Sequence, residues 1–311
     1  MSLQDDPVDT IPVTRALRRS RGRWRIFAFV VLAVAALVGF ARFYPLMAPV
    51  GDVIARVTIS GTITTDPERT ALLEDLAEDD SVSAVIVAIN SPGGTTAGGE
   101  ELYASLRALA EQKPVVSTIG ELGASAAYMA AIATDRIYAR NLSIVGSIGV
   151  YYQHVDASGL FETLGVDLDK VASGPLKGKP DFDEPISPQV RDSLVELVDS
   201  SYRYFVDLVA ERRGLTRSDT LALADGRILS GVMAIDAGLI DAAGGETEAL
   251  AWLQTEREID PGLDIVPVWP RQRAPGWLDL LFGSLAGAFG ETGWPGLPLD
   301  GLVSLWHPQA R

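Results

Sequence analysis

From Gly51 onward, the chain alternates short runs rich in β-branched residues with amphipathic stretches of helical length. Strands that are separated by helices pair in parallel, so this alternation predicts an α/β fold with a largely parallel, layered sheet and flanking helices. The expected strands are 53–63, 83–89, 115–119, 136–139, 147–152 and 168–172. The expected helices are 67–78, 96–111, 125–133, 157–164, 188–213 and 218–224.

The longest expected helix, 188–213, carries the clearest end signals of the chain. Ser187 fits the N-cap, Pro188 the first helical position, and Gly214 follows the last turn. Its apolar residues cover more than one stripe, which predicts contacts both with its own core and with another subunit. The preceding stretch, 177–187, is polar and rich in Pro, Gly and Asp, as is typical of a loop.

The N-terminal segment predicts one transmembrane helix. Residues 1–25 contain six arginines, and an uncharged apolar run then covers 26–41 and continues past Arg42 to Met47. Running to Leu46, a helix would span about 31 Å, enough for the hydrocarbon core if Arg42 reaches the interface. The positive-inside rule places residues 1–25 in the cytoplasm and the chain after the anchor (26–48) outside it. A buried soluble helix and a cleaved signal peptide are the alternatives.

Composition excludes several classes of site. The chain has no cysteine and two histidines, so a cysteine nucleophile, a thiolate zinc site and a histidine-rich metal centre are all excluded. We expect no metal and no cofactor. The net charge of -15 disfavours nucleic acid as a partner.

A serine and two glycines predict acyl-transfer chemistry. Ser125 lies in Gly-Ala-Ser-Ala-Ala-Tyr, where an expected strand turns into a helix. Asn-Ser-Pro-Gly-Gly, residues 90–94, follows the preceding apolar strand at the edge where α/β sheets place ligands. The backbone N–H groups of Gly94 and Ala126 are therefore candidate donors for an oxyanion hole. Taken alone, the two motifs are more often a turn and a helix cap.

A serine nucleophile needs a proton acceptor, and arginine stays protonated. The candidates are four lysines and one histidine: Lys113, Lys170, Lys177, Lys179 and His154. A lysine acts as a base only where burial lowers its pKa from about 10.4 toward neutrality. Lys113 fits a solvated helix end, and His154 fits a structural role at a strand end. Lys177 follows a Ser-Gly-Pro turn, and Lys179 is its main competitor.

Read in order, these motifs resemble the SppA-type signal peptide peptidases, membrane-anchored serine proteases related in fold to the Clp protease subunit and the crotonases. The resemblance covers about 53–250. It rests on 89–94, 123–128, Gly-Ser-Ile-Gly-Val at 146–150, Ser-Gly-Pro-Leu-Lys at 173–177, and Ala-Asp-Gly-Arg at 224–227 with Gly-Leu-Ile-Asp at 238–241. This chain has Ala126 and Ala127 where family members tend to have glycines, which leaves the shape of the substrate pocket open.

The resemblance implies a Clp/crotonase-like fold, with Ser125 as nucleophile, Lys177 as general base, Ser147 as the residue that orients the lysine, and Gly94 in the oxyanion hole. It implies a ring-like homo-oligomer whose dyad is completed between neighbouring subunits. The expected substrates are signal-peptide remnants or other small membrane-associated peptides, bound as an added strand with a small or apolar residue before the scissile bond. The expected location is the cell membrane, with the catalytic domain on the periplasmic side.

The expected peptidase domain covers 51–256, and 257–311 form a C-terminal tail. That tail either packs a few aromatic residues on the body or contacts the membrane interface or another subunit. Two other functions compete with the peptidase. A crotonase-like acyl-CoA enzyme would use the same glycine oxyanion hole, and a membrane scaffold would keep the fold without activity.

Overall fold

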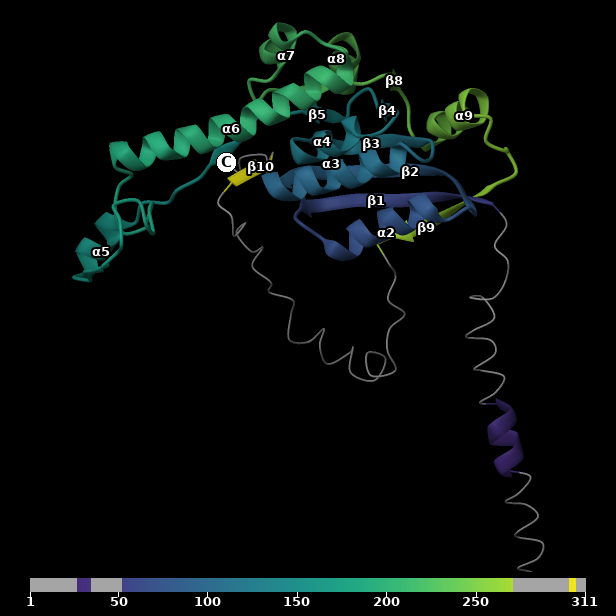
Figure 1. Ribbon diagram of the computed structural model, residues 1–311, viewed down its shortest axis with the longest axis horizontal. Helices are drawn as coiled ribbons and strands as arrows, with labels where there is room; N and C mark the ends of the chain where they lie inside the picture. The colour runs from purple at the N-terminus through teal and green to yellow at the C-terminus, as the bar shows by residue number, and fades with distance from the viewer. Residues whose placement is uncertain (1–26, 35–51, 271–301, 306–311) are drawn as a thin grey trace, which may run out of the picture. The chain divides into compact units, whose positions relative to one another are not determined.

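The computed structural model describes residues 27–34, 52–270 and 302–305, within two units, 1–51 and 52–311 (Figure 1). In the first unit, residues 27–34 are helical and exposed. The rest of the expected anchor lies outside the described residues. Within the described ranges, no helix combines the length and the apolar character needed to cross a membrane.

The second unit is built on a mixed sheet of ten described strands. Pairing is parallel along β9-β1-β2-β3-β4-β8 and between β3 and β5, whereas β5 pairs antiparallel with β7, and β10 antiparallel with β2 and β6. The strands are β1 (Val53–Ile63), β2 (Val82–Thr95), β3 (Val115–Ala124), β4 (Arg136–Ala139), β5 (Ile144–Gly146), β6 (Tyr151–Tyr152), β7 (Ile228–Ser230), β8 (Ala242–Ala243), β9 (Asp264–Trp269) and β10 (Leu302–Leu305).

Helices flank this sheet, and side chains cap several of them. Thr95 accepts a hydrogen bond from the Gly98 amide at the start of α3, and Ser187 accepts one from the Val190 amide at the start of α6. The helices are α2 (Pro67–Glu78), α3 (Thr96–Ala110), α4 (Ala126–Ile132), α5 (Ser158–Leu164), α6 (Pro188–Arg213), α7 (Arg217–Leu223), α8 (Gly231–Asp236) and α9 (Glu246–Glu256).

The central strands are buried on both faces. In β2, Val85 and Val87 join the larger core, which also contains apolar residues of α2, α3, α4 and α6, whereas Ala84 and Ile86 join a smaller core with Trp252 of α9. Side chains alternate between the two faces of a strand, so a continuous apolar run is what this position requires. The α/β fold with a mixed sheet and flanking helices confirms the fold class at this level.

One of the expected strands is wrong, and a second is only partly confirmed. Residues 168–172 form no strand: Val171 is 98% exposed, and no described strand pairs with this stretch. The expected strand 147–152 is reduced to β6, because the chain bends away where Gly146 (φ 94°) and Ser147 (φ 53°) adopt left-handed conformations. The helix 188–213 is confirmed with both of its predicted ends.

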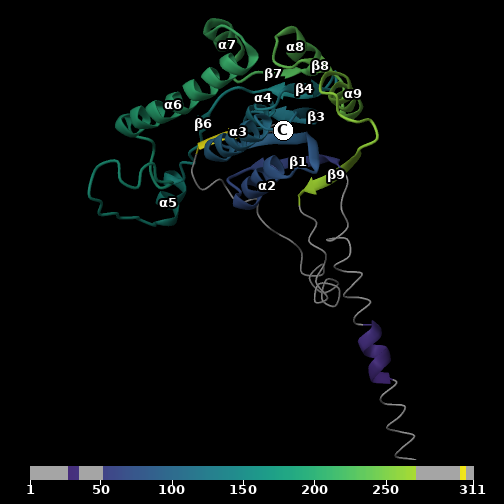
Figure 2. The same ribbon diagram turned by 45° about the vertical axis from the view of Figure 1, so that its right-hand side comes forward.

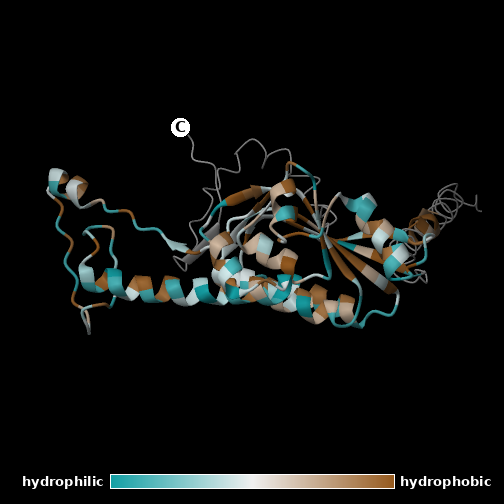
Figure 3. Ribbon diagram, turned by 90° about the horizontal axis from the view of Figure 1, so that it is seen from above, coloured by the Kyte–Doolittle hydropathy of each residue, from teal (hydrophilic) through white to brown (hydrophobic). Residues whose placement is uncertain are grey.

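An arm projects from the sheet (Figures 1 and 2). We use this name for residues 157–197, which contain α5, the loop that follows it and the first ten residues of α6. Helix α5 contains no buried residue, whereas the second half of α6 buries Phe205, Val206 and Val209 completely. Apolar and polar residues alternate along all of α6 (Figure 3), and Val195 and Leu197 are exposed.

Candidate functional site

The glycine pair predicted for the oxyanion hole lies inside a strand. β2 continues past a register shift at Asn90 and pairs Gly93 and Gly94 with Thr62 and Ile63 of β1. A Cβ atom on Gly94 would lie 1.7 Å from the Ile63 carbonyl oxygen, so only glycine fits there. The close approach of β1 therefore already requires glycine at position 94, independently of any role in an oxyanion hole.

Ser91 holds the shifted part of β2 in place. Its buried Oγ donates a hydrogen bond to the Gly61 carbonyl at 2.6 Å and accepts one from the Gly93 amide at 3.1 Å. One hydroxyl thus connects β1 and β2 beside the glycine pair. The sequence motif Ser-Pro-Gly-Gly is typical of a turn, but here the neighbouring strand keeps it extended.

Ser125 lies at the junction between β3 and α4 in a strained backbone conformation. Its φ and ψ are 59° and -122°, values that non-glycine residues rarely adopt, and its amide donates to the Gly146 carbonyl at 2.8 Å. It occupies the N-cap position of α4, but its side chain accepts no capping hydrogen bond. Such strain at a strand-to-helix turn is the setting in which α/β hydrolases hold a nucleophilic serine.

The register of β2 and β3 brings the predicted residues to one edge of the sheet. Ser91 is opposite Gly123, and Ala124 is opposite Gly146 of β5. The carboxyl ends of these strands, which carry or lead into Gly94, Ser125 and Ser147, are therefore neighbours. Ala126 follows Ser125 as the first residue of α4 and is fully buried. The amides of the first helical turn lack partners within the helix and favour an anion.

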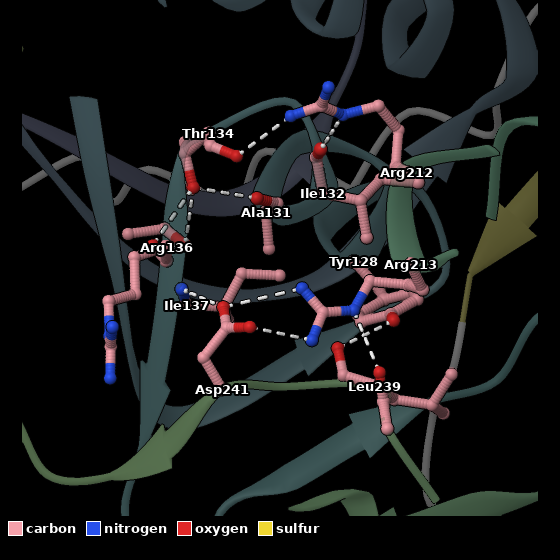
Figure 4. Close-up of polar contacts among 12 residues, drawn as sticks. Tyr128, Ala131, Ile132, Thr134, Arg136, Ile137, Arg212, Arg213, Leu239 and Asp241 are labelled. Atoms are coloured by element: carbon pink, nitrogen blue, oxygen red, sulfur yellow. Dashed lines mark hydrogen bonds and ion pairs between the residues drawn. The ribbon is translucent and has the colours of Figure 1, made fainter. Parts of the chain in front are cut away.

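Helix α4 is fastened to α6 and to the 238–241 segment (Figure 4). The fully buried Tyr128 donates to the Leu239 carbonyl at 2.7 Å, and burial raises its pKa. Arg213 donates to Asp241 at 2.8 Å, and Asp241 also accepts from the Ile137 amide at 2.7 Å. These contacts explain the motif Gly-Leu-Ile-Asp, whose role the sequence left open.

A neighbouring arginine closes the far end of the same helix. Arg212 donates to the Ile132 carbonyl at 2.8 Å and to the Thr134 carbonyl at 3.1 Å (Figure 4). The last carbonyls of a helix lack intrahelical donors, so this guanidinium acts as a cap from α6. Arg212 and Arg213 were not predicted as functional residues, and their position in the last turn of 188–213 was the available signal.

Ser147 is supported by the Asp-Gly-Arg motif. Its amide donates to the Arg227 carbonyl at 2.8 Å, and the Gly226 amide donates to the Ile148 carbonyl at 3.2 Å. Arg227 forms an ion pair with Asp225 at 2.6 Å, and its hydrogen bonds lower the pKa of that carboxyl to about 2. Like Ser125, Ser147 has a positive φ, so two of the predicted site serines are held in strained backbone.

Three of the four lysines are engaged by neighbouring groups. Lys113 donates to the Val82 carbonyl at 2.8 Å, which identifies it as a structural residue. Lys170 pairs with Asp181, whose hydrogen bond raises the pKa of that amine, and Lys179 pairs with Glu184. His154 contacts the Glu184 carbonyl through its ring at 3.2 Å, in agreement with its expected structural role.

Lys177 differs from the other three lysines. It is exposed, and among the described residues its ammonium group has neither an ion pair nor a hydrogen bond. It lies in the loop between α5 and α6, which Figures 1 and 2 show on the arm, away from α4. The structure thus brings Gly94, Ser125, Ala126 and Ser147 to one edge of the sheet, and it leaves Lys177 apart from them within one chain.

Residues 107–260 match the model of peptidase family S49. The chain is 36% identical over 67% of its length to "Putative protease slr0021" of Synechocystis, and it covers 76% of that protein. It is 30% identical to "Serine protease SPPA, chloroplastic" of Arabidopsis thaliana over 58% of this chain and 27% of that one. It is 32% identical to "Putative signal peptide peptidase SppA" of Enterococcus faecium over 60% of this chain and 55% of that one. The chain therefore belongs to peptidase family S49, the SppA-type serine proteases.

Proposed function

We propose that this serine peptidase is a membrane-anchored endopeptidase that cleaves small membrane-associated peptides such as signal-peptide remnants. Ser125 is the nucleophile, and Lys177 of a neighbouring copy is the general base. The observation that carries the assignment of Ser125 is its backbone: a buried serine, 1% exposed, kept at φ 59° on the turn between β3 and α4. Strain of this kind costs about 1–3 kcal/mol and is found mainly at functional sites.

The proposed reaction is acyl transfer. The neutral Lys177 amine takes the proton of the Ser125 hydroxyl as Oγ attacks the peptide carbonyl carbon. The N–H groups of Gly94 and Ala126 stabilise the resulting oxyanion. The protonated amine then gives its proton to the leaving amine, and an acyl-enzyme forms. Water, deprotonated by the same lysine, attacks the acyl carbon, and the lysine returns that proton to Ser125 Oγ as the acyl group leaves as a carboxylic acid, while Ser147 orients the lysine.

The position of Lys177 supports a dyad that is completed between copies. An amine that acts as a base must be uncharged, which requires its removal from water. Lys177 is exposed in a single chain, and we propose that a second copy covers it. The arm that carries it also exposes Val195 and Leu197 of α6, apolar side chains that a contact between copies would bury. These features support a closed homo-oligomer in which each arm reaches the next site.

The proposed anchor and substrate class rest on sequence. Six arginines precede an apolar run that starts at Ile26, which favours a single pass with the N-terminus in the cytoplasm. One relative bears the name signal peptide peptidase. A membrane anchor would hold the catalytic domain next to apolar peptides released in the bilayer. We also propose that the fold is of the Clp and crotonase type that the resemblance implies.

Mixing two inactive variants tests the shared dyad. Ser125→Ala and Lys177→Ala are each expected to lose hydrolysis of a short apolar peptide ester. After co-refolding in equal amounts, about a quarter of the sites in a head-to-tail ring receive Ser125 from one copy and Lys177 from the next, so activity returns. Lys179→Ala is the matched control, because its side chain is paired with Glu184, and it should stay active.

The results of this mixing experiment separate the alternatives. Restored activity supports a dyad shared between copies. A mixture that stays inactive, although both variants form the same oligomer as the wild type, contradicts it. A serine-reactive fluorophosphonate probe then checks the nucleophile, because it should label the wild type and leave Ser125→Ala unlabelled.

A further inference from the structure

The C-terminal strand β10 lies next to the glycine pair of the proposed active site. Val303, Ser304 and Leu305 pair antiparallel with Thr95, Gly94 and Gly93 of β2. On its other side, β10 pairs antiparallel with Tyr151 and Tyr152 of β6. A segment far away in the sequence thus fills the slot between β2 and β6.

This slot has the features of a site for an extended peptide. Its β2 side contains Gly94, a proposed oxyanion donor, and the neighbouring strand β3 leads into Ser125. Strand edges offer unpaired N–H and C=O groups to any added strand, so pairing there depends little on the side chains of the peptide. A peptide bound in this slot would run past the nucleophile, and β10 shows that an antiparallel strand fits.

We propose that the segment Leu302–Leu305 is an internal competitor of peptide substrates, which occupies the substrate position of its own chain and must leave before a substrate binds. The proposal rests on the function proposed above, because the slot is a substrate site only if Ser125 is the nucleophile. It adds a regulatory role to the C-terminal tail, in place of a membrane or subunit contact.

The chemistry of the segment fits the substrates proposed for the enzyme. Leu-Val-Ser-Leu is uncharged and mostly apolar, as a signal-peptide remnant is. An apolar pocket of about 320 Å³ borders the slot at Tyr152 and reaches Leu194 and Val198 of α6, and it could accept an apolar side chain of a bound peptide. The segment 302–305 and a bound peptide substrate would therefore pair with the same edge of β2 and lie next to the same apolar pocket.

A proline substitution tests the competition. Val303→Pro removes the amide of the one residue of β10 that is opposite both Thr95 and Tyr151, and it disfavours the ladder on both sides. If the tail fills the slot in nine of ten molecules, releasing it lowers KM for a short peptide substrate about tenfold and leaves kcat unchanged. Val303→Ala, which keeps the amide, is the matched control and should behave as the wild type.

Hydrogen exchange gives a readout that does not depend on catalysis. Backbone amides of 93–95 and 151–152 should exchange faster in Val303→Pro than in Val303→Ala. A synthetic peptide of residues 300–307 should restore a high KM to Val303→Pro as a competitive inhibitor, and the same peptide with proline at 303 should not. The KM difference between the two variants should persist on tenfold dilution of the enzyme, because the competitor is part of the same chain.

The outcomes distinguish this proposal from the proposed function. Equal KM values and equal exchange in the two variants overturn the internal competitor, even if the fluorophosphonate probe labels Ser125 in both. A KM difference that disappears on dilution also overturns it, since a competitor that is part of the same chain cannot be diluted away. If no variant is labelled or active, the function proposed for Ser125 fails, and exchange still reports whether β10 pairs in the slot.

Discussion

Gly99 in α3 packs against the first turn of α4, and its replacement by alanine would move Ala126, the residue that follows the proposed nucleophile Ser125. A Cβ atom on Gly99 would lie 2.9 Å from Cβ of Ala126 and 3.4 Å from the sulfur of Met129. The two Cβ atoms would have to separate to at least 3.4 Å, the lower limit of ordinary contact. Both contacts are in the buried core, so the separation requires a shift of one helix.

Two effects on stability oppose each other in Gly99→Ala. Alanine is better than glycine inside a helix by about 0.5–1 kcal/mol. Overpacking of a filled core costs about 1–3 kcal/mol. The second effect is larger, so we expect a net loss of about 0.5–2 kcal/mol in the free energy of unfolding. A displacement of the Ala126 amide by about 0.5 Å reaches the tolerance of a catalytic site, so kcat/KM should fall by roughly tenfold or more.

Gly159→Ala is the matched control for this prediction. Gly159 also lies in a helix, α5, and nothing would contact a Cβ atom there within 4 Å. Urea unfolding should show Gly159→Ala at or above the wild-type stability, and peptide hydrolysis should be unchanged. If Gly99→Ala equals Gly159→Ala in both unfolding midpoint and kcat/KM, the contact between α3 and α4 does not position the oxyanion donor, and the reasoning is refuted.

Three further predictions follow from the described contacts. Ser125→Gly and Ser125→Ala should both lose hydrolysis, but glycine tolerates φ 59°, so Ser125→Gly should be about 1–2 kcal/mol more stable in urea than Ser125→Ala; equal stabilities would show that the turn is unstrained. Asp241→Ala leaves the guanidinium of Arg213 without its carboxylate and should cost about 2–4 kcal/mol in the same assay, whereas a loss below that range would show that the ion pair contributes little. Hydrogen bonds from Arg227 lower the pKa of Asp225 to about 2. The Asp225–Arg227 ion pair therefore stabilises the folded state above about pH 4, and this stabilisation is lost as the pH falls through 2. The melting temperature of Asp225→Asn should be lower than that of the wild type at pH 5 and should converge with it near pH 2.

The parts of the fold that depend on local signals could be predicted from sequence. The helix 188–213 has a capping serine, a proline at its first position and a glycine after its last turn, and the structure has these bounds. The strand 53–63 is a long apolar run between polar turns, and it was also placed correctly. Such signals act within a few residues, so a single sequence contains them.

The extent of the sheet depends on partners distant in the sequence. Ser-Pro-Gly-Gly reads as a turn but is part of β2, because β1 pairs with it after a register shift. The apolar residues at 168–172 are typical of a strand, yet they pair with no described strand. The strands β9 and β10, in the segment expected to be a tail, join the sheet through β1 and β2. Pairing over such separations leaves little trace in the local pattern.

The candidate site shows the same contrast between features set by local sequence and features set by distant partners. Residues supplied by the ends of consecutive strands, such as Gly94 and Ser125, could be predicted to lie together, because parallel strands place their carboxyl ends at one edge. The strained backbone at Ser125 and Ser147 could not be inferred, since the groups that their amides bind, the carbonyls of Gly146 and Arg227, belong to other parts of the fold than the local motif around each serine. Lys177 is a different case: it lies exposed on the arm, and the catalytic role proposed for it needs a neighbouring copy that the fold of one chain does not supply. The local sequence therefore predicts the proposed nucleophile, the fold brings the proposed oxyanion donors close to it, and the role proposed for Lys177 requires a second copy.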